Sequence, residues 1–128
     1  MKVLVLSNGE LKEQEIGTEL EDLQKIVGGW IEIPFLSHKF RDNGIDVIIN
    51  EEGKLIEGMK PEIVILDGET EELLDIVYGN CIFASHDEEG NTIELTAEQL
   101  EIIQEELCLT AKVNLKNGGV FDVRVLIV

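Results

Sequence analysis

The sequence contains few of the residues that build metal sites and aromatic cores. Among its 128 residues are two histidines and two cysteines, and aromatic residues make up only 5%. A metal site needs histidine, cysteine or carboxylate ligands at short spacings. His38 and His86 lie far apart, and neither has a second histidine or cysteine at such a spacing. We therefore expect two surface-loop histidines, an aliphatic core, no metal ion and no cofactor.

The cysteines are too few for a disulfide-rich secreted domain. Cys81 lies in an apolar run, and Cys108 follows a segment with helical periodicity. The apolar run at 3–6 is too short for a signal peptide, and no stretch approaches the length of a membrane span. These features are typical of a reduced cytoplasmic protein with two buried, unbridged thiols and no membrane contact.

Basic residues are also scarce. The chain has 10 Lys and Arg against 27 Asp and Glu, which gives a formal net charge of −17. Direct binding of nucleic acid needs clustered positive charge to neutralise phosphates, and here the basic residues never form a cluster of three. The charge instead favours a protein partner with a basic surface. Acidic residues also increase solubility, so the charge by itself leaves both roles open.

No catalytic motif is present in the sequence. Nucleophilic catalysis needs Ser or Cys beside a placed base, but Ser85 and His86 are adjacent and would point to opposite faces of a strand. Gly28-Gly29 follows a predicted helix, whereas a phosphate-binding glycine loop precedes one. We therefore interpret the two glycines as a helix stop and expect a protein that is not an enzyme.

The most informative stretch joins a helix to a strand at these two glycines. The helix is predicted over 18–27, with Thr18 as its cap and Glu21 in the reciprocal position. Its apolar residues recur at steps of three and four, at Leu20, Leu23, Ile26 and Val27. A strand is predicted over 30–36, with Pro34 indicating an edge or an end. It carries the single tryptophan, Trp30, which we interpret as a core residue, the alternative being an exposed interface anchor.

The rest of the chain is predicted to be mostly strands. A second main helix is predicted over 96–107, capped by Thr96 with Gln99, and a weaker helix over 69–76. Residues 37–44 are predicted to be a loop, and the Asn117-Gly118 pair a tight hairpin turn. Further strands are predicted over 2–6, 10–16, 45–50 with a continuation at 54–56, 61–66, 80–85, 92–95, 110–115 and 120–128. The sequence thus predicts one α+β domain over 1–128, with two main helices packed on a mostly antiparallel or mixed sheet and a C-terminal β-hairpin.

Two dense groups of carboxylates are candidates for an interaction surface. The first lies on one face of the helix at 96–107, opposite Leu100, Ile103 and Leu107; the second falls in and after the segment 69–72. With Trp30, the candidate interaction residues are Glu98, Glu101, Glu105, Glu69, Glu71, Glu72 and Asp75.

Three sequence runs in this order carry a family resemblance. They are LQKIVGGWIE at 23–32, NEEGKL at 50–55 and LTAEQ at 95–99. Over residues 16–107 the chain resembles an uncharacterised domain family, domain-of-unknown-function family 3846, encoded mainly by bacteriophages, plasmids and their bacterial hosts. Residues 108–128 are predicted to be a C-terminal hairpin added to it. The resemblance implies no catalytic residue.

Three functions follow as hypotheses. The first is a phage or mobile-element accessory protein that binds a host protein through its acidic surface, inhibiting a defence or nucleic-acid-binding protein. The second is a small-ligand or nucleotide-sequestering protein, which would need a local basic pocket from residues such as Lys25, Lys39 and Arg41. The third is an uncharacterised enzyme. The sequence does not define the oligomeric state.

Overall fold

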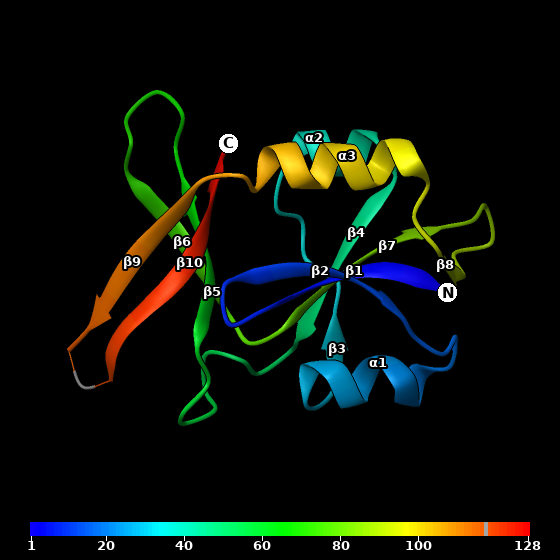
Figure 1. Ribbon diagram of the computed structural model, residues 1–128, viewed down its shortest axis with the longest axis horizontal. Helices are drawn as coiled ribbons and strands as arrows, with labels where there is room; N and C mark the ends of the chain where they lie inside the picture. The colour runs from blue at the N-terminus through cyan, green and yellow to red at the C-terminus, as the bar shows by residue number, and fades with distance from the viewer. Residues whose placement is uncertain (117) are drawn as a thin grey trace.

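Two β-sheets and three helices form the chain in a computed structural model that describes residues 1–116 and 118–128 (Figure 1). The protein is therefore α+β, as the sequence predicts. The helices are α1 (Leu20–Val27), α2 (His38–Asp42) and α3 (Ala97–Glu106). Within the described ranges, no helix is long and apolar enough to cross a membrane.

The first sheet is antiparallel throughout. Its strand order is β2-β1-β7-β4-β3, and β8 pairs with β7. The strands of the first sheet are β1 (Lys2–Ser7), β2 (Glu10–Glu15), β3 (Ile31–Glu32), β4 (Ile45–Asn50), β7 (Cys81–His86) and β8 (Thr92–Ile93). The predicted strands over 2–6, 45–50 and 80–85 are confirmed to within a residue or so.

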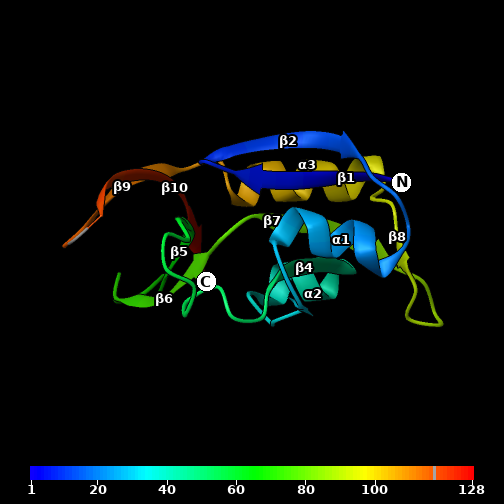
Figure 2. The ribbon, with the colours of Figure 1, turned by 90° about the horizontal axis from the view of Figure 1, so that it is seen from below.

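The first sheet is covered on both faces, which explains the continuous apolar runs in its central strands. Val3 and Val5 of β1 pack toward α1, whereas Leu4 and Leu6 belong to the larger core cluster that includes residues of α2, α3 and the second sheet. Figure 1 shows α1 and α3 on opposite sides of β1, and Figure 2 shows the strands of the second sheet together at one side of these elements. Alternate residues of the same strand therefore contribute to two separate cores.

The second sheet is mixed. Its order is β6-β5-β10-β9, with β10 parallel to β5 and the other pairs antiparallel. Its strands are β5 (Pro61–Leu66), β6 (Leu73–Tyr78), β9 (Thr110–Leu115) and β10 (Gly119–Ile127). The C-terminal hairpin of β9 and β10 is confirmed, although Asn117 of the predicted turn lies outside the described residues. The predicted arrangement of two helices packed on one sheet is too simple, because three helices and two sheets contribute residues to the core clusters.

The two longer helices end and begin largely as their sequences predict. Thr96 caps α3, since its Oγ1 accepts the N–H of Gln99 at 3.1 Å and its own N–H donates to Gln99 Oε1 at 2.9 Å. Gly28 ends α1 with a φ of +83°, a conformation that glycine adopts without strain. The start of α1 is corrected by one residue, because Glu19 and not Thr18 precedes its first turn and donates its N–H to Asp22 Oδ2.

Three predictions in the first half of the chain are wrong. The segment 37–44 is not simply a loop, because Ser37 Oγ accepts the N–H of Phe40 at 3.1 Å and starts α2. Phe40 is buried and contacts Phe83 edge to ring, so tertiary packing stabilises a helix too short to form alone. The strand predicted over 30–36 shrinks to β3, and Trp30 is 70% exposed, which contradicts the core interpretation.

Two predictions between β4 and β7 are also wrong. The weak helix over 69–76 is a turn followed by β6. Asp67 Oδ1 accepts the N–H groups of Glu69 and Thr70, and Glu71 has a φ of +61°, so the local hydrogen bonds close a loop and do not propagate a helix. The strand continuation at 54–56 consists of turns.

Candidate functional site

A cleft of about 600 Å³ lies between the two sheets, where an edge of each sheet meets the other. One wall is formed by the segment 34–36 that follows β3 and by the turn 50–55 that follows β4. The other wall is formed by β6, with Ile65 of β5 and Val128 at the end of β10 beside it. Both β3 and β6 are edge strands, so the cleft joins two free sheet edges.

Glycine brings the two walls together at one end of the cleft. Gly53 is buried, and a Cβ built on it would lie 2.7 Å from the carbonyl oxygen of Tyr78. Any side chain at this position would push the turn 50–55 away from the end of β6. The glycine of the NEEGKL run therefore sets the width of the cleft at this end.

Asn50 fixes the turn that forms the first wall. Its Nδ2 donates to the carbonyl of Val27 at 3.1 Å, and its Oδ1 accepts the N–H of Glu52 at 2.7 Å. The N–H of Glu51 donates to the carbonyl of Trp30 at 2.8 Å. Two of the sequence runs, at 23–32 and 50–55, thus meet in space, and their contact positions the cleft wall against the end of α1.

Large apolar side chains at this cleft are open to solvent. Leu55 is 84% exposed, Leu74 is 52% exposed, and Phe35 and Val128 are also exposed. Single exposed apolar residues are common, but a group of them around one concave surface marks a binding site. Burial of these four side chains by a bound molecule would be favourable.

The cleft is bordered mainly by negative charge. Glu32, Glu51, Glu52 and Asp75 are among its lining residues, and Lys54 is the one basic residue among those described there. Lys54 is already paired with Asp75 across the cleft. The hydrogen bond from Lys54 and, less strongly, the N–H of Ile76 lower the pKa of Asp75, opposing partial desolvation. Asp75 is therefore ionised at neutral pH, and acidic side chains outnumber basic ones along the rim.

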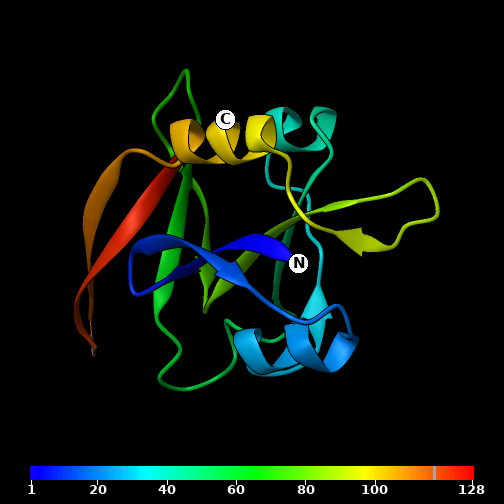
Figure 3. The ribbon, with the colours of Figure 1, turned by 45° about the vertical axis from the view of Figure 1, so that its right-hand side comes forward.

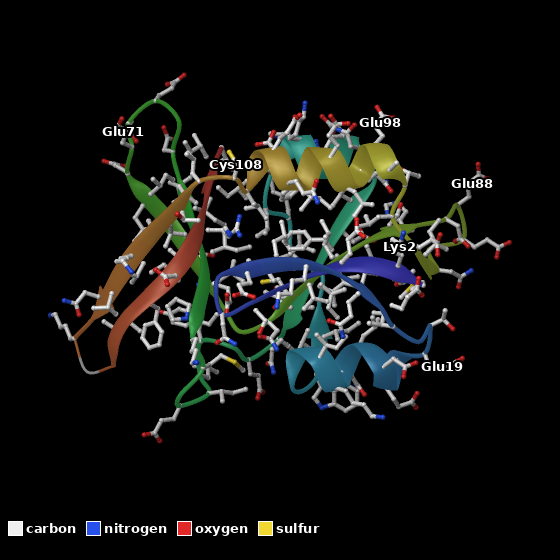
Figure 4. The ribbon with its side chains drawn as sticks, in the orientation of Figure 1. Lys2, Glu19, Glu71, Glu88, Glu98 and Cys108 are labelled. Atoms are coloured by element: carbon white, nitrogen blue, oxygen red, sulfur yellow. The ribbon has the colours of Figure 1, made fainter. Side chains whose placement is uncertain are left out.

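Of the predicted interaction residues, the structure brings only Asp75 to the cleft. Glu69, Glu71 and Glu72 lie exposed in the loop between β5 and β6. Glu98, Glu101 and Glu105 lie on the exposed face of α3, as predicted, while Ile103 and Leu107 on the other face are buried. Figures 1 and 3 place this loop and α3 toward the same end of the molecule, and Figure 4 labels Glu71 and Glu98 there. The two acidic groups thus flank one end without joining.

Trp30 lies away from the cleft. Its ring borders a shallow hollow beside Gln24 and Lys25 of α1. The backbone of Trp30 supports the cleft wall through Glu51, while its side chain contributes nothing to the cleft. In the structure, Trp30 therefore lies apart from the acidic residues that were predicted with it as interaction residues.

The basic pocket required for a nucleotide is not formed by the three residues named for it. Arg41 donates to His38 Nδ1 at 2.9 Å, lies 3.5 Å from Asp42 and sits over the Phe35 ring. Lys25 borders a different hollow on α1. The sequence predicts no metal site because its two histidines lie far apart. Separately, in the described parts of the chain no group of three His, Cys, Asp or Glu side chains could hold a metal ion.

The apolar residues of the cleft are absent from the interaction residues predicted from the sequence. Leu55 stands in a segment rich in glycine and charge, where an apolar residue is a usable signal of an exposed contact. Phe35 and Leu74 carry no such signal, because each was assigned to an element expected to be packed. The cleft also combines separate segments of the chain, and no local pattern shows that these segments meet.

A family model described as "Domain of unknown function (DUF3846)" matches residues 1–108. The match begins earlier than the resemblance over 16–107 and includes the whole of the first sheet and α3. It ends before the hairpin of β9 and β10. No curated protein and no solved structure matches the chain.

Proposed function

The chain belongs to the DUF3846 family, and since that family carries no assigned function, we propose one from the cleft: a non-enzymatic module that binds another protein. The partner is a host protein, and the bound part is a segment that carries both basic and apolar side chains. The observation that carries this proposal is the exposed apolar cleft with an acidic rim.

The chemistry of the cleft defines the partner segment. Apolar side chains of the partner would cover Phe35, Leu55 and Leu74, and such buried anchors supply most of the binding energy in protein interfaces. Basic side chains would face Glu51, Glu52 and the other rim carboxylates. A net charge of −17 adds long-range attraction for a basic partner.

The acidic residues outside the cleft have a separate role in this proposal. The carboxylates of α3 and of the β5–β6 loop lie at one end of the molecule (Figures 1 and 4) and steer the partner before contact, which raises the association rate more than the affinity. A nucleic-acid-binding protein offers a basic groove of the required sign. Occupation of that groove would inhibit it, so the accessory role in a mobile element is inhibition of such a host protein.

The proposal is tested by capture of host proteins on paired variants. Leu55→Ala with Leu74→Ala removes two apolar cleft residues, while Leu20→Ala with Val120→Ala removes two exposed residues elsewhere. Quantitative mass spectrometry should show a basic protein retained by the wild type and by the second variant, and lost from the first. Retention of that protein by both variants alike would contradict a role for the cleft.

The inhibitory role is tested with the captured partner. Purified partner should lose affinity for its nucleic acid as this protein is added, because both ligands would need the same basic groove. If the partner, its nucleic acid and this protein form a ternary complex without mutual loss of affinity, the basic groove is not occluded. The protein would then bind the partner without inhibiting it.

A small ligand is the second candidate, and the cleft volume favours it. About 600 Å³ is within the size range of small-molecule sites. The carboxylate rim disfavours nucleotide phosphates, so such a ligand would be neutral or cationic. Thermal-shift screening of neutral and cationic compounds separates this candidate from the first, because the Leu55→Ala, Leu74→Ala variant should then lose a ligand-induced shift without any protein partner.

A further inference from the structure

The strand β6 has an open backbone edge that lies along the cleft. It is the outermost strand of the second sheet, paired on one side with β5. The five successive residues 74–78 all line the cleft. Side chains of a strand alternate between its two faces, so successive residues border one cleft only where the cleft follows the strand's edge.

The N–H of Ile76 is directed to that edge. Ile76 lies opposite Val64 of β5 in the register of the sheet. Its N–H nevertheless donates, at 2.8 Å, to Oδ1 of Asp75, which is a side chain of β6 itself. Asp75 Oδ1 also accepts from Lys54, which reaches it from the opposite wall. One side chain and one ion pair therefore occupy the position where a neighbouring strand would place a carbonyl group.

The edge strands β2 and β9 are better protected than β6. The edge strand β2 has the sequence ELKEQE, and β9 carries Lys112, which pairs with Asp122 of β10. Charged residues on an edge prevent the addition of further strands. Like β6, β9 has a single charged residue, but its exposed residues are the polar Thr110, Lys112 and Asn114. In contrast, β6 has the sequence LLDIVY and exposes Leu73 and Leu74 beside Asp75.

We propose that the partner segment binds in the cleft as an added β-strand on the open edge of β6. This inference rests on the proposed function and specifies how the partner binds. The segment is extended, with alternating apolar and basic side chains. Its backbone pairs with β6, its apolar side chains cover Leu74 and Phe35, and its basic side chains replace Lys54 at Asp75 and meet Glu51 and Glu52. Strand addition of this kind takes affinity from main-chain hydrogen bonds and specificity from alternate side chains.

The charge of the protein selects this occupant over a second copy. Pairing of β6 with the β6 of another molecule would bring two acidic rims together in a chain of net charge −17. Like charges placed together disfavour association, and the same field favours a basic strand.

The experiment uses an alternating lysine–valine peptide as the probe and compares Ile76→Pro with Ile76→Ala. Both variants lose the isoleucine side chain, but only proline also removes the N–H at the open edge. Proline with its nitrogen on the free side of an edge strand is compatible with the sheet. We expect wild type and Ile76→Ala to bind the peptide, and Ile76→Pro to bind at least about tenfold more weakly than Ile76→Ala, since a main-chain hydrogen bond is lost.

A modified peptide provides an independent measurement on the wild-type protein. Methylation of alternate backbone nitrogens on one edge of the peptide should abolish binding, whereas methylation on the other edge should preserve it. This comparison decides the matter even where Ile76→Pro fails to fold.

The outcomes separate the binding mode from the function. Equal binding to Ile76→Pro and Ile76→Ala, or to both methylated peptides, would overturn strand addition and leave the cleft as a binding site. A wild-type protein that binds no alternating peptide but captures a host protein through the cleft would also overturn strand addition alone. Failure of both peptide binding and cleft-dependent capture would overturn the proposed function. A concentration-dependent dimer blocked by Ile76→Pro would assign the edge to a second copy.

Discussion

Glu62 on β5 accepts the N–H of Gly9 at 2.9 Å, which ties the second sheet to the β1–β2 turn of the first. The same carboxylate accepts the N–H of Asn8 at 2.8 Å, and the Glu62 side chain is almost fully buried. From β10, Arg124 donates its Nε to the carbonyl of Gly9 at 2.9 Å. The turn Asn8-Gly9 is therefore held by an acceptor and a donor that both come from the second sheet.

Replacing Glu62 should weaken the junction between the sheets. We expect Glu62→Ala to lower the free energy of unfolding by about 3 kcal/mol, since the N–H groups of Asn8 and Gly9 lose a charged acceptor in partly buried hydrogen bonds. Glu62→Gln keeps one acceptor oxygen and should cost less. Urea unfolding of both variants checks this ordering, and a Glu62→Ala protein as stable as the wild type would show that the N–H groups find other partners.

Glu62 should also give stability a pH dependence of unusual sign. Burial raises the pKa of Glu62 above its ordinary value of 4.5, and this effect exceeds the lowering by the N–H groups of Gly9 and Asn8 and by the nearby Lys60. The folded state then binds more protons than the unfolded state, so this residue's contribution to stability falls as pH rises from 4.5 through the raised pKa. The difference in unfolding free energy between wild type and Glu62→Gln, measured over this range, should decrease with pH. An unchanging difference would contradict the raised pKa.

The strands were easier to predict from the sequence than the contacts between them. The apolar runs at 3–6 and 81–84 identified central strands because both faces of the first sheet are covered. The Thr96 and Gln99 cap was identifiable because both of its hydrogen bonds are local. In contrast, the buried Glu62 was not singled out, because its partners are more than fifty residues away.

The errors share a physical cause, which is that tertiary contacts override local propensity. The segment 69–76 is rich in helix formers, yet pairing with β5 holds its second half as a strand. Residues 38–42 have no helical periodicity to detect, and the burial of Phe40 stabilises α2. The cleft could not be predicted because its walls meet at Gly53 and Tyr78, while Asn50 ties one wall to the end of α1, and these contacts depend on the complete fold.

Trp30 provides a direct test of one corrected prediction. Because its side chain is 70% exposed, we expect Trp30→Ala to change the free energy of unfolding by at most about 0.5 kcal/mol. Fluorescence of the native protein should resemble that of a solvated indole and should be quenched readily by acrylamide. A loss of several kcal/mol, or resistance to quenching, would restore the core interpretation.

The two cysteines should differ in reactivity. Both are free, which confirms that they are unbridged, but Cys81 is buried and Cys108 is exposed, so the expectation of two buried thiols is wrong. Burial and the nearby charge of Glu62 raise the pKa of Cys81, which disfavours its reactive thiolate. Iodoacetamide should therefore add one group to the native protein and two after denaturation, as read by intact mass. The variant Cys108→Ser should remain unmodified when native, and rapid alkylation of that variant would contradict burial of Cys81.

The acidic face of α3 provides a test of electrostatic steering. If Glu98, Glu101 and Glu105 steer a basic partner, changing all three to glutamine should slow association and flatten its dependence on salt, with a smaller effect on dissociation. The alternating lysine–valine peptide serves as the partner, and stopped-flow kinetics at several salt concentrations supply the rates. The same change at Glu69, Glu71 and Glu72 tests the loop between β5 and β6.

The control for both triple variants removes the same charge from β2 and from the beginning of α1. It carries glutamine at Glu13, Glu19 and Glu21, which are exposed, and Figure 4 shows Glu19 near α1, at the other end from Glu98. Because steering depends on where charge lies as well as on its total, the control should slow association less than either triple variant. Equal slowing by all three would mean that only the net charge acts, and no slowing by any would leave the acidic surface with a role in solubility alone.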